Sequence, residues 1–382
     1  MNLLFTSLLY FGCFVFTIAG AGNPVTKNDR EEQKNRYVQG WNILSDDEKL
    51  AEMVIEHSRD YSINHLQLSH HLIMDLRHAK NPARAARINR LVNRAHEAGI
   101  PKVLIWDHML YPLDYYPEEF RTGPGNLIDL DNPEFWAWIK NDYREMLRLV
   151  PEIDGLILTF IETGARIENQ YSRVLKTPQE KLAAMIDTIS SLIIDEKGLE
   201  LYVRTFFYTR QERENMLNCL NLIQNEGLRV MTKEVPHDFF LTHPSASYVG
   251  NIKFPVIIEF DAAHEYNGQG IIASIFPDLH LKRWESYKKL PNVIGYVARS
   301  LSEGLTDLKE VALEMYRYPF KGPVGQFEWE EDIYRGLAYY NAIQNRQSDG
   351  YTPKTFPQFP YKGIPPKERE KIWYEAFKDN ER

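Results

Sequence analysis

The chain has 382 residues, of which 43% are hydrophobic and 26% are charged, and its formal net charge is −8. This composition is typical of a folded globular protein and excludes both a disordered chain and a multispan membrane protein. The negative charge argues against a nucleic-acid partner, because phosphate binding needs clustered Lys and Arg side chains.

The first 21 residues have the pattern of an export signal. An apolar run over residues 3–18 precedes the small-residue triplet AGA at 19–21, which is typical of a signal-peptidase cleavage site. We therefore expect a secreted or periplasmic protein, with no stable membrane insertion once residues 1–21 are removed. Two alternatives stay open. The segment could remain as an uncleaved anchor, since no Lys or Arg precedes the apolar run, or Cys13 could carry a lipid.

After a polar linker at residues 22–35, short apolar runs alternate with amphipathic helical patterns. The apolar runs predict strands at residues 36–44, 62–69, 101–108, 154–163, 199–207, 228–235, 254–261 and 292–300. Helix starts between them carry capping boxes, Ser45 with Glu48 and Thr177 with Glu180. Eight strands alternating with helices predict an α/β fold with a parallel sheet, and eight is the number that closes into a TIM barrel.

We place this (β/α)8 catalytic barrel at residues 36–320. A doubly wound open sheet is the alternative, but no Gly-rich phosphate-binding turn follows the first predicted strand. Residues 321–382 contain two helical patterns separated by a Pro-rich crossing. This extension is too short for an independent core, so we expect it to pack on the barrel.

The predicted strand ends carry many ionisable side chains. In chain order these are His70, His71, Asp107, His108, Glu162, Arg204, Lys233, His237, Asp238, Glu259, Asp261, Glu265 and Arg299. In a (β/α)8 barrel the carboxyl ends of the strands converge on the active site. Burial of so many charges is unfavourable unless they pair or act on a ligand, so we predict an active site at this end. The alternative is that the cations only neutralise the carboxylates.

Aromatic side chains near the same strand ends would suit the flat faces of sugar rings. They are Trp41, Trp106, Tyr111, Tyr115, Tyr116, Phe206, Tyr208, Phe239 and Tyr266, although packing explains many aromatic residues in any protein. We expect no metal and no cofactor. His70 and His71 make a poor chelating pair, because adjacent residues on a strand point to opposite faces.

Two stretches resemble strand ends of clan A glycoside hydrolases. They are DGLILTFIET, which contains Glu162, and PVIIEFD, which contains Glu259. The resemblance implies that Glu162 is the acid/base and that Glu259 is the nucleophile, although Ile161 stands where that clan usually has Asn. Several segments, among them MTKEVPHDFF and IEFDAAHEYNGQG, are similar to bacterial barrel proteins related to alpha-glucuronidases. That likeness implies that an inverting outcome is possible, with Asp261 or Glu265 competing for the role of base.

The strand-end residues together predict a glycoside hydrolase that uses two carboxyl groups. We expect the apolar end of strand four to favour the protonated form of Glu162, the general acid, while Glu259 works ionised. Arg204, Lys233 and Arg299 would bind an acidic sugar, uronic or sulfated, and Trp106 and Tyr266 would contact it. Two alternatives stay open: a Schiff-base lyase or aldolase that uses Lys233, and a carbohydrate-binding barrel without catalysis.

Overall fold

A computed structural model describes residues 37–44, 47–61, 63–70, 72–205, 207–236, 239, 244–261 and 277–301. All of them belong to a compact unit that starts at Tyr37. The predicted signal peptide, linker and C-terminal extension lie outside the described residues. The same holds for Ser45, His71, Phe206, His237, Asp238, Glu265 and Tyr266. No helix within the described ranges is long and apolar enough to cross a membrane.

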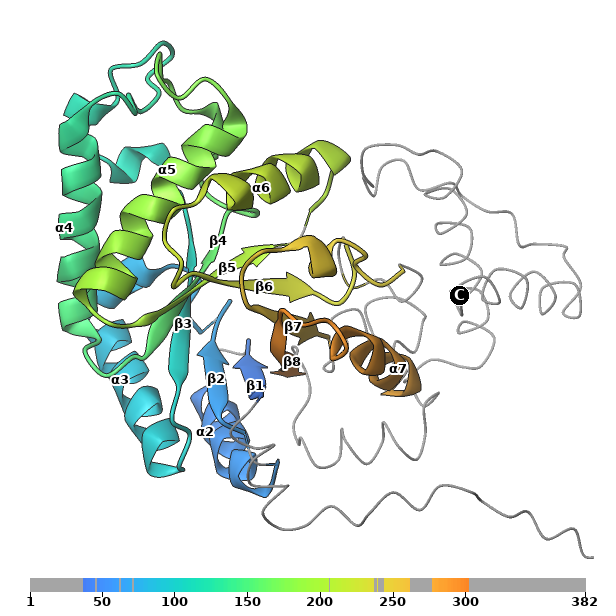
Figure 1. The fold of residues 1–382 in the computed structure, drawn as a ribbon. Coiled ribbons are helices and arrows are strands. Elements are labelled where there is room, and N and C mark those ends of the chain that lie inside the picture. Colours follow the sequence, from blue (N-terminus) through green and yellow to red (C-terminus); the bar gives the residue numbers. More distant parts are fainter. Residues whose placement is uncertain are drawn as a thin grey trace, which may run out of the picture. The chain divides into compact units, whose positions relative to one another are not determined.

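Eight parallel strands close into a barrel in sequence order (Figure 1). They are β1 (Val38–Ile43), β2 (His65–Leu68), β3 (Val103–His108), β4 (Gly155–Thr159), β5 (Glu200–Thr205), β6 (Arg229–Lys233), β7 (Val256–Phe260) and β8 (Val293–Leu301). β8 pairs with β1 and completes the ring. The predicted (β/α)8 barrel is therefore confirmed, and the open sheet is wrong.

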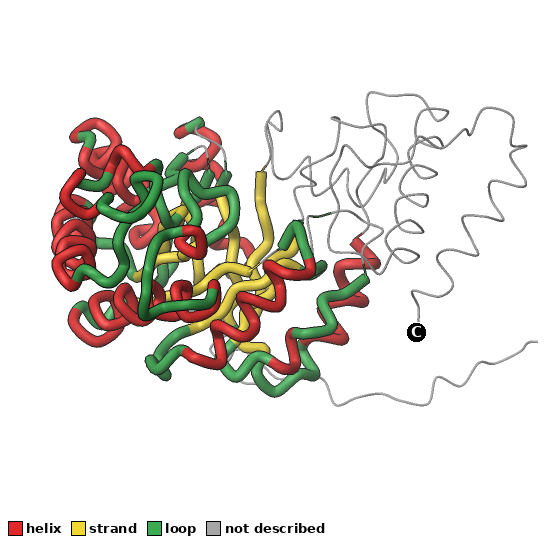
Figure 2. Tube along the Cα trace, turned by 90° about the horizontal axis from the view of Figure 1, so that it is seen from above, coloured by secondary structure: helices red, strands yellow, loops and turns green. Residues whose placement is uncertain are grey.

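Helices lie outside the strands, as the turned view in Figure 2 shows. They are α2 (Glu48–His57), α3 (Pro82–Glu97), α4 (Pro133–Leu149), α5 (Pro178–Ser190), α6 (Arg210–Leu222) and α7 (Pro277–Tyr287). Short helical turns join them: η1 (Ser58–Tyr61), η2 (Leu76–Lys80), η3 (Leu113–Tyr115), η4 (Glu118–Phe120), η5 (Ile167–Asn169), the π-helical η6 (Ser191–Glu196) and η7 (Val249–Asn251). In the described part of the β6–β7 connection, η7 is the one helical segment.

The start of α5 shows why the sequence predicts helix boundaries well. The Thr177 hydroxyl accepts from the Glu180 backbone N–H, and the Glu180 carboxylate accepts from the Thr177 N–H at 2.8 Å. Pro178 occupies the first turn, where its missing N–H loses no helical bond. This predicted capping box is confirmed, and Thr209 with Glu212 forms another at the start of α6.

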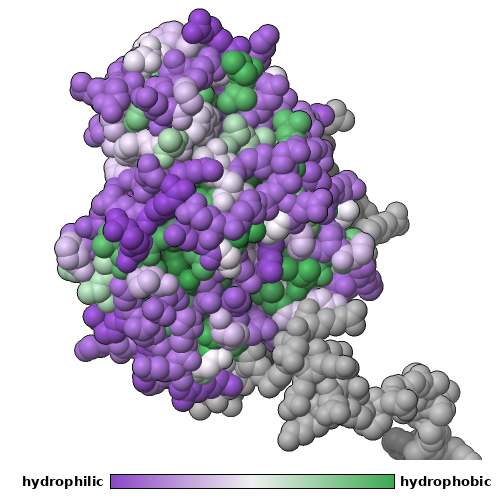
Figure 3. Space-filling view, turned by 60° about the vertical axis from the view of Figure 1, so that its left-hand side comes forward, coloured by the Kyte–Doolittle hydropathy of each residue, from purple (hydrophilic) through white to green (hydrophobic). Residues whose placement is uncertain are grey.

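Two apolar layers support the barrel. The larger one lies between the strands and the helices, and the smaller one fills the barrel interior. The interior layer consists of Leu104, Trp106, Ile157, Tyr202, Met231, Ile257 and Val297. Because side chains alternate along a strand, neighbouring residues at one strand end enter different layers. The outer surface seen in Figure 3 is mostly hydrophilic, as expected when apolar side chains are used in these layers.

Barrel closure depends on a glycine. A Cβ atom at Gly295 would lie 2.2 Å from the Val38 carbonyl oxygen and 2.5 Å from the Val38 nitrogen. These are backbone atoms of the paired strand, so they cannot move aside without shifting β1 against β8. We expect Gly295→Ala to lower the free energy of unfolding by about 1–3 kcal/mol in chemical denaturation, the usual range for overpacking.

Gly250→Ala is the matched control. Its added methyl group would meet only Leu290, at 3.4 Å, which is an ordinary contact. Equal stability losses in the two variants would show that the approach of β1 to β8 is not the limiting constraint.

Candidate active site

Trp106 belongs to the interior apolar layer and contacts the polar side chains at the carboxyl ends of the strands. Its indole N–H donates to the side-chain amide oxygen Oε1 of Gln67 at 3.0 Å, which fixes the ring inside the barrel. The Arg204 guanidinium carbon lies 4.5 Å from the ring centroid, and the His70 ring lies 4.8 Å away. The predicted Trp106 is thus a platform for charged residues above the apolar layer.

Arg204 and Glu259 form a bidentate ion pair on this platform. Arg204 Nε lies 2.7 Å from Glu259 Oε2, and Arg204 Nη2 lies 3.2 Å from Oε1. Their side chains are 2% and 0% exposed, respectively. Two hydrogen bonds from the guanidinium engage both carboxylate oxygens, so the Glu259 side chain is held in a fixed orientation. Arg204 is therefore paired with a carboxylate of the protein itself, as the alternative interpretation of the cations predicts.

Two more cations surround the pair. Lys233 is 3% exposed and Arg299 2%. Lys233 Nζ and the Arg299 guanidinium carbon lie 4.2 and 5.1 Å from the centroid of the Phe239 ring. Asp261, two residues after Glu259, is also buried and extends the same side of β7. The structure therefore brings four strand ends, those of β5, β6, β7 and β8, to one charged cluster.

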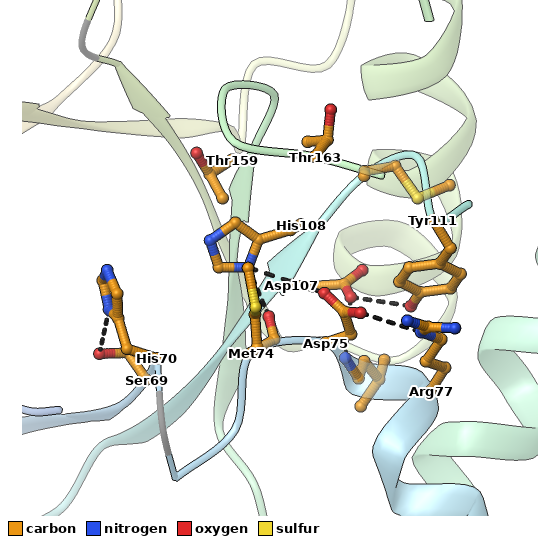
Figure 4. Close-up of polar contacts among 12 residues, drawn as sticks. Ser69, His70, Met74, Asp75, Arg77, Asp107, His108, Tyr111, Thr159 and Thr163 are labelled. Carbon is orange, nitrogen blue, oxygen red and sulfur yellow. Dashed lines mark hydrogen bonds and ion pairs between the residues drawn. The ribbon is translucent and has the colours of Figure 1, made fainter. Parts of the chain in front are cut away.

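His70 and His108 complete this cluster. Burial lowers the pKa of both imidazoles, and the positive charges of Arg299, Arg204 and Lys233 lower that of His70 further. The His108 Nδ1 atom lies 2.5 Å from the Met74 carbonyl oxygen and 3.8 Å from an Asp75 carboxylate oxygen (Figure 4). These histidines therefore stay neutral amid the cations.

Glu162 lies at the rim and differs from the prediction in its surroundings. β4 ends at Thr159, and Glu162 follows in a turn with a φ of 61° and an exposed side chain. The expected apolar surroundings are therefore wrong. The Tyr208 hydroxyl donates to Glu162 Oε1. The Glu162 carboxylate raises the pKa of His108, against the larger lowering by burial, so it lies near the cluster.

Asp107 does not reach the mouth, where we predicted it. Its carboxylate points into the helix layer and accepts from the Leu76 N–H and the Tyr111 hydroxyl, each at 2.8 Å, and from the Tyr143 hydroxyl. Tyr111 and Tyr116 are buried in the same layer, so they serve packing. The alternation of side chains on β3 explains this, because it sends Asp107 outward and His108 inward.

Sequence reasoning missed the residues that orient the histidines. The Ser69 hydroxyl lies 3.1 Å from His70 Nδ1 and donates to Asn42 Oδ1 at 2.6 Å. The Met74 carbonyl binds His108. Asn42 at the end of an apolar run was the available signal, since a buried amide needs a partner. The Met74 contact uses a backbone atom, so no side-chain pattern indicates it.

Asp107 gives the stability a pH dependence. Burial raises the pKa of its carboxyl from 3.8 to about 7, although three hydrogen bonds oppose the change. The protonated Asp107 carboxyl contributes its full stabilisation of the folded protein at a pH below the pKa that this group has in the unfolded chain. This contribution is lost as the pH rises to about 7, the pKa in the folded protein. Asp107→Asn cannot titrate. Urea unfolding should therefore show wild type losing up to about 4 kcal/mol relative to this variant between about pH 4 and pH 8.

The exposed Asp114→Asn variant is the control, and it should follow wild type at each pH. A pH-independent difference between wild type and Asp107→Asn would mean that the carboxyl is ionised throughout.

The fold and this cluster define a (β/α)8 barrel with buried charges at the end where such barrels hold their active sites. No family model matches the sequence, and no curated protein matches it. Among solved structures, CpGH84B has 11% identity and a TM-score of 0.47, covering 78% of this chain and 50% of its own. CpGH84D has 10% identity and a TM-score of 0.45, covering 89% and 47%.

The chain thus spans about half the length of those two structures, 50% and 47%. Both names carry the label of glycoside hydrolase family 84. The barrel assignment rests on the strand pairing of this chain and not on the likeness. The relation to alpha-glucuronidases stays a prediction.

Proposed function

We propose that the protein is a glycoside hydrolase that acts on a substrate containing an acidic sugar. The observation that carries the proposal is the convergence of Arg204, Lys233 and Arg299 with Glu259 and Asp261 at the carboxyl ends of the strands. Hydrolysis of a glycosidic bond needs one carboxylic acid and one carboxylate on opposite sides of the bond. A barrel mouth that holds several carboxyl groups suits this chemistry.

The charge of the cluster supports an anionic substrate. Among the described residues of the barrel interior, three cations accompany the carboxylates of Glu259 and Asp261. Glu234 does not add to them, because its carboxylate binds Arg283 at 2.9 Å on the outer side of β6. A uronic or sulfated sugar would form charge-assisted hydrogen bonds with these cations, whereas a neutral sugar would not.

Glu162 and Glu259 take different roles in the proposal. Glu162 is exposed at the rim, where a bound sugar would exclude water and favour the protonated form that an acid requires. Glu259 acts as the base or nucleophile in the proposal, with Arg204 bound to its carboxylate. Asp261 remains the alternative base, since it directly follows the last residue of β7.

Glu162→Gln tests the acid role. The amide cannot donate a proton to the leaving oxygen, so we expect kcat to fall by about 10²- to 10⁴-fold on acidic oligosaccharides, measured as reducing ends released. Glu152→Gln changes an exposed glutamate in the turn after α4 and should leave the rate unchanged. Near-normal turnover in Glu162→Gln would remove this residue from the mechanism.

Arg299→Ala tests the substrate charge. We expect binding of an acidic oligosaccharide to weaken by about 10-fold or more, the loss of a charge-assisted contact. Its carboxyl-reduced, neutral counterpart should bind the variant and wild type equally in titration calorimetry. If both ligands lose affinity to the same degree, the arginine supports the barrel and not the substrate.

A Schiff-base enzyme is the second candidate, favoured by the burial of Lys233 within the cationic cluster. Neighbouring cations and apolar surroundings are known to activate lysine amines. Incubation with a sugar aldehyde or keto acid and borohydride would then attach the carbonyl compound to Lys233, as detected by peptide mass. Such an adduct during turnover would replace the hydrolase proposal.

A further inference from the structure

His70 and His108 share one feature that the proposed function does not use, the position of their ring protons. A carbonyl oxygen can only accept, so the His108 Nδ1 that faces Met74 must carry a proton. A neutral imidazole has one ring proton, and Nε2 of His108 is therefore an unprotonated acceptor.

The same reasoning applies to His70 through a different partner. The Ser69 hydroxyl directs its hydrogen to Asn42 Oδ1 at 2.6 Å, or to the Ile43 carbonyl oxygen at 3.4 Å. In either case the Ser69 oxygen offers a lone pair to His70 Nδ1 at 3.1 Å, so Nδ1 donates. His70 Nε2 is then an acceptor too.

The two rings lie close together at the mouth. Their centroids are 6.1 Å apart, and both rings neighbour Trp106, at 4.8 and 6.2 Å. Figure 4 shows the Nδ1 edge of His108 toward Met74 and Asp75, and its other nitrogen on the side of His70. No hydrogen bond to either Nε2 atom occurs within the described residues.

We propose that His70 and His108 bind sugar hydroxyl groups through their Nε2 atoms, while the neighbouring cations bind the carboxylate of the same sugar. This inference rests on the proposed function and narrows its substrate to a uronic acid with free hydroxyl groups. A hydroxyl group is the part of a sugar that donates to an imidazole lone pair. A sugar carboxylate matches the cations, and Arg299 and Lys233 both lie near His70.

The neighbouring cations help to keep His70 and His108 neutral, and a histidine ring has an acceptor nitrogen only when it is neutral. Arg299, Arg204 and Lys233 lower the pKa of His70, and Arg204 lowers that of His108, in addition to burial. Asp75 and Glu162 act on His108 in the opposite direction. Burial and the cations outweigh these carboxylates, so both histidines keep the neutral form that can accept a hydrogen bond.

The tautomers are tested directly by NMR on the full chain with ¹⁵N-labelled histidine. We expect protonated Nδ1 and unprotonated Nε2 in His70 and His108 near neutral pH. Saturating glucuronate or galacturonate should shift the Nε2 resonances, and the corresponding O-methylated uronates should not, because a methylated hydroxyl has no proton to donate. Protonated Nε2 atoms, or Nε2 resonances that neither sugar moves, would overturn the proposal.

Paired substitutions test the contribution to binding. His108→Phe keeps an aromatic ring but removes the lone pair, and should weaken uronate binding about 10-fold, the value of one hydrogen bond. His108→Gln places an amide oxygen near the Nε2 position and should recover most of the affinity. His96→Phe is the control, because it removes a ring on α3 that hydrogen-bonds to Asp154. This variant should bind the uronate as wild type does.

The outcomes separate the two proposals. Equal affinity of wild type, His108→Phe and His108→Gln would overturn the histidine role and leave the hydrolase intact. Hydrolysis of a neutral glycoside, with no uronate binding to wild type, would overturn the uronate inference and the acidic substrate, but it would leave the glycoside hydrolase intact. Uronate binding with the expected ¹⁵N shifts but without any hydrolysis would support the histidine site and overturn the hydrolase.

Discussion

The bidentate ion pair between Arg204 and Glu259 is the interaction around which the barrel mouth is arranged. It joins β5 to β7 across β6, rests on Trp106, and is almost completely shielded from water. Removal of one member of such a pair leaves an uncompensated buried charge, at a cost of about 3–5 kcal/mol. The pair also gives the buried Glu259 carboxylate a partner of opposite charge in a dry interior. Its neighbours Lys233 and Arg299 add two further buried cations to the mouth.

The alternation of side chains on the strands decides which charged residues join this cluster. Lys233 and Glu234 are adjacent, yet Lys233 approaches Phe239, whereas Glu234 binds His280 and Arg283 of α7. Burial alone would raise the pKa of Glu234, but His280 and Arg283 lower it to about 2. Asp107 is separated from His108 in the same way. A strand end rich in ionisable groups therefore contains one set for the interior and another set that anchors the helices.

The alternation of side chains along the strands also limits how much of the fold and of the candidate site the sequence predicts. The eight apolar runs and the Thr177 capping box are local signals, and the structure confirms the barrel that they indicate. The grouping of Arg204 with Glu259 follows once the strand ends are known to converge. The exposure of Glu162 does not follow, because it depends on where β4 ends and on a left-handed turn. The proton positions of His70 and His108 depend on contacts with the Met74 carbonyl and the Ser69 hydroxyl, which apolar periodicity does not encode.

The backbone at the mouth places some ionisable residues within strands and others in turns. Arg204, Lys233, Glu259 and Arg299 lie within strands whose neighbours hydrogen-bond on both sides, so their charges are oriented before any ligand binds. His70 and Glu162 instead occupy turns just beyond β2 and β4, with φ values of 48° and 61°. Non-glycine residues are uncommon in this region of backbone space, and such strained positions concentrate at functional sites. In the proposed function, the cations within the strands bind the anionic group of the sugar, and the two turn residues contact the rest of it.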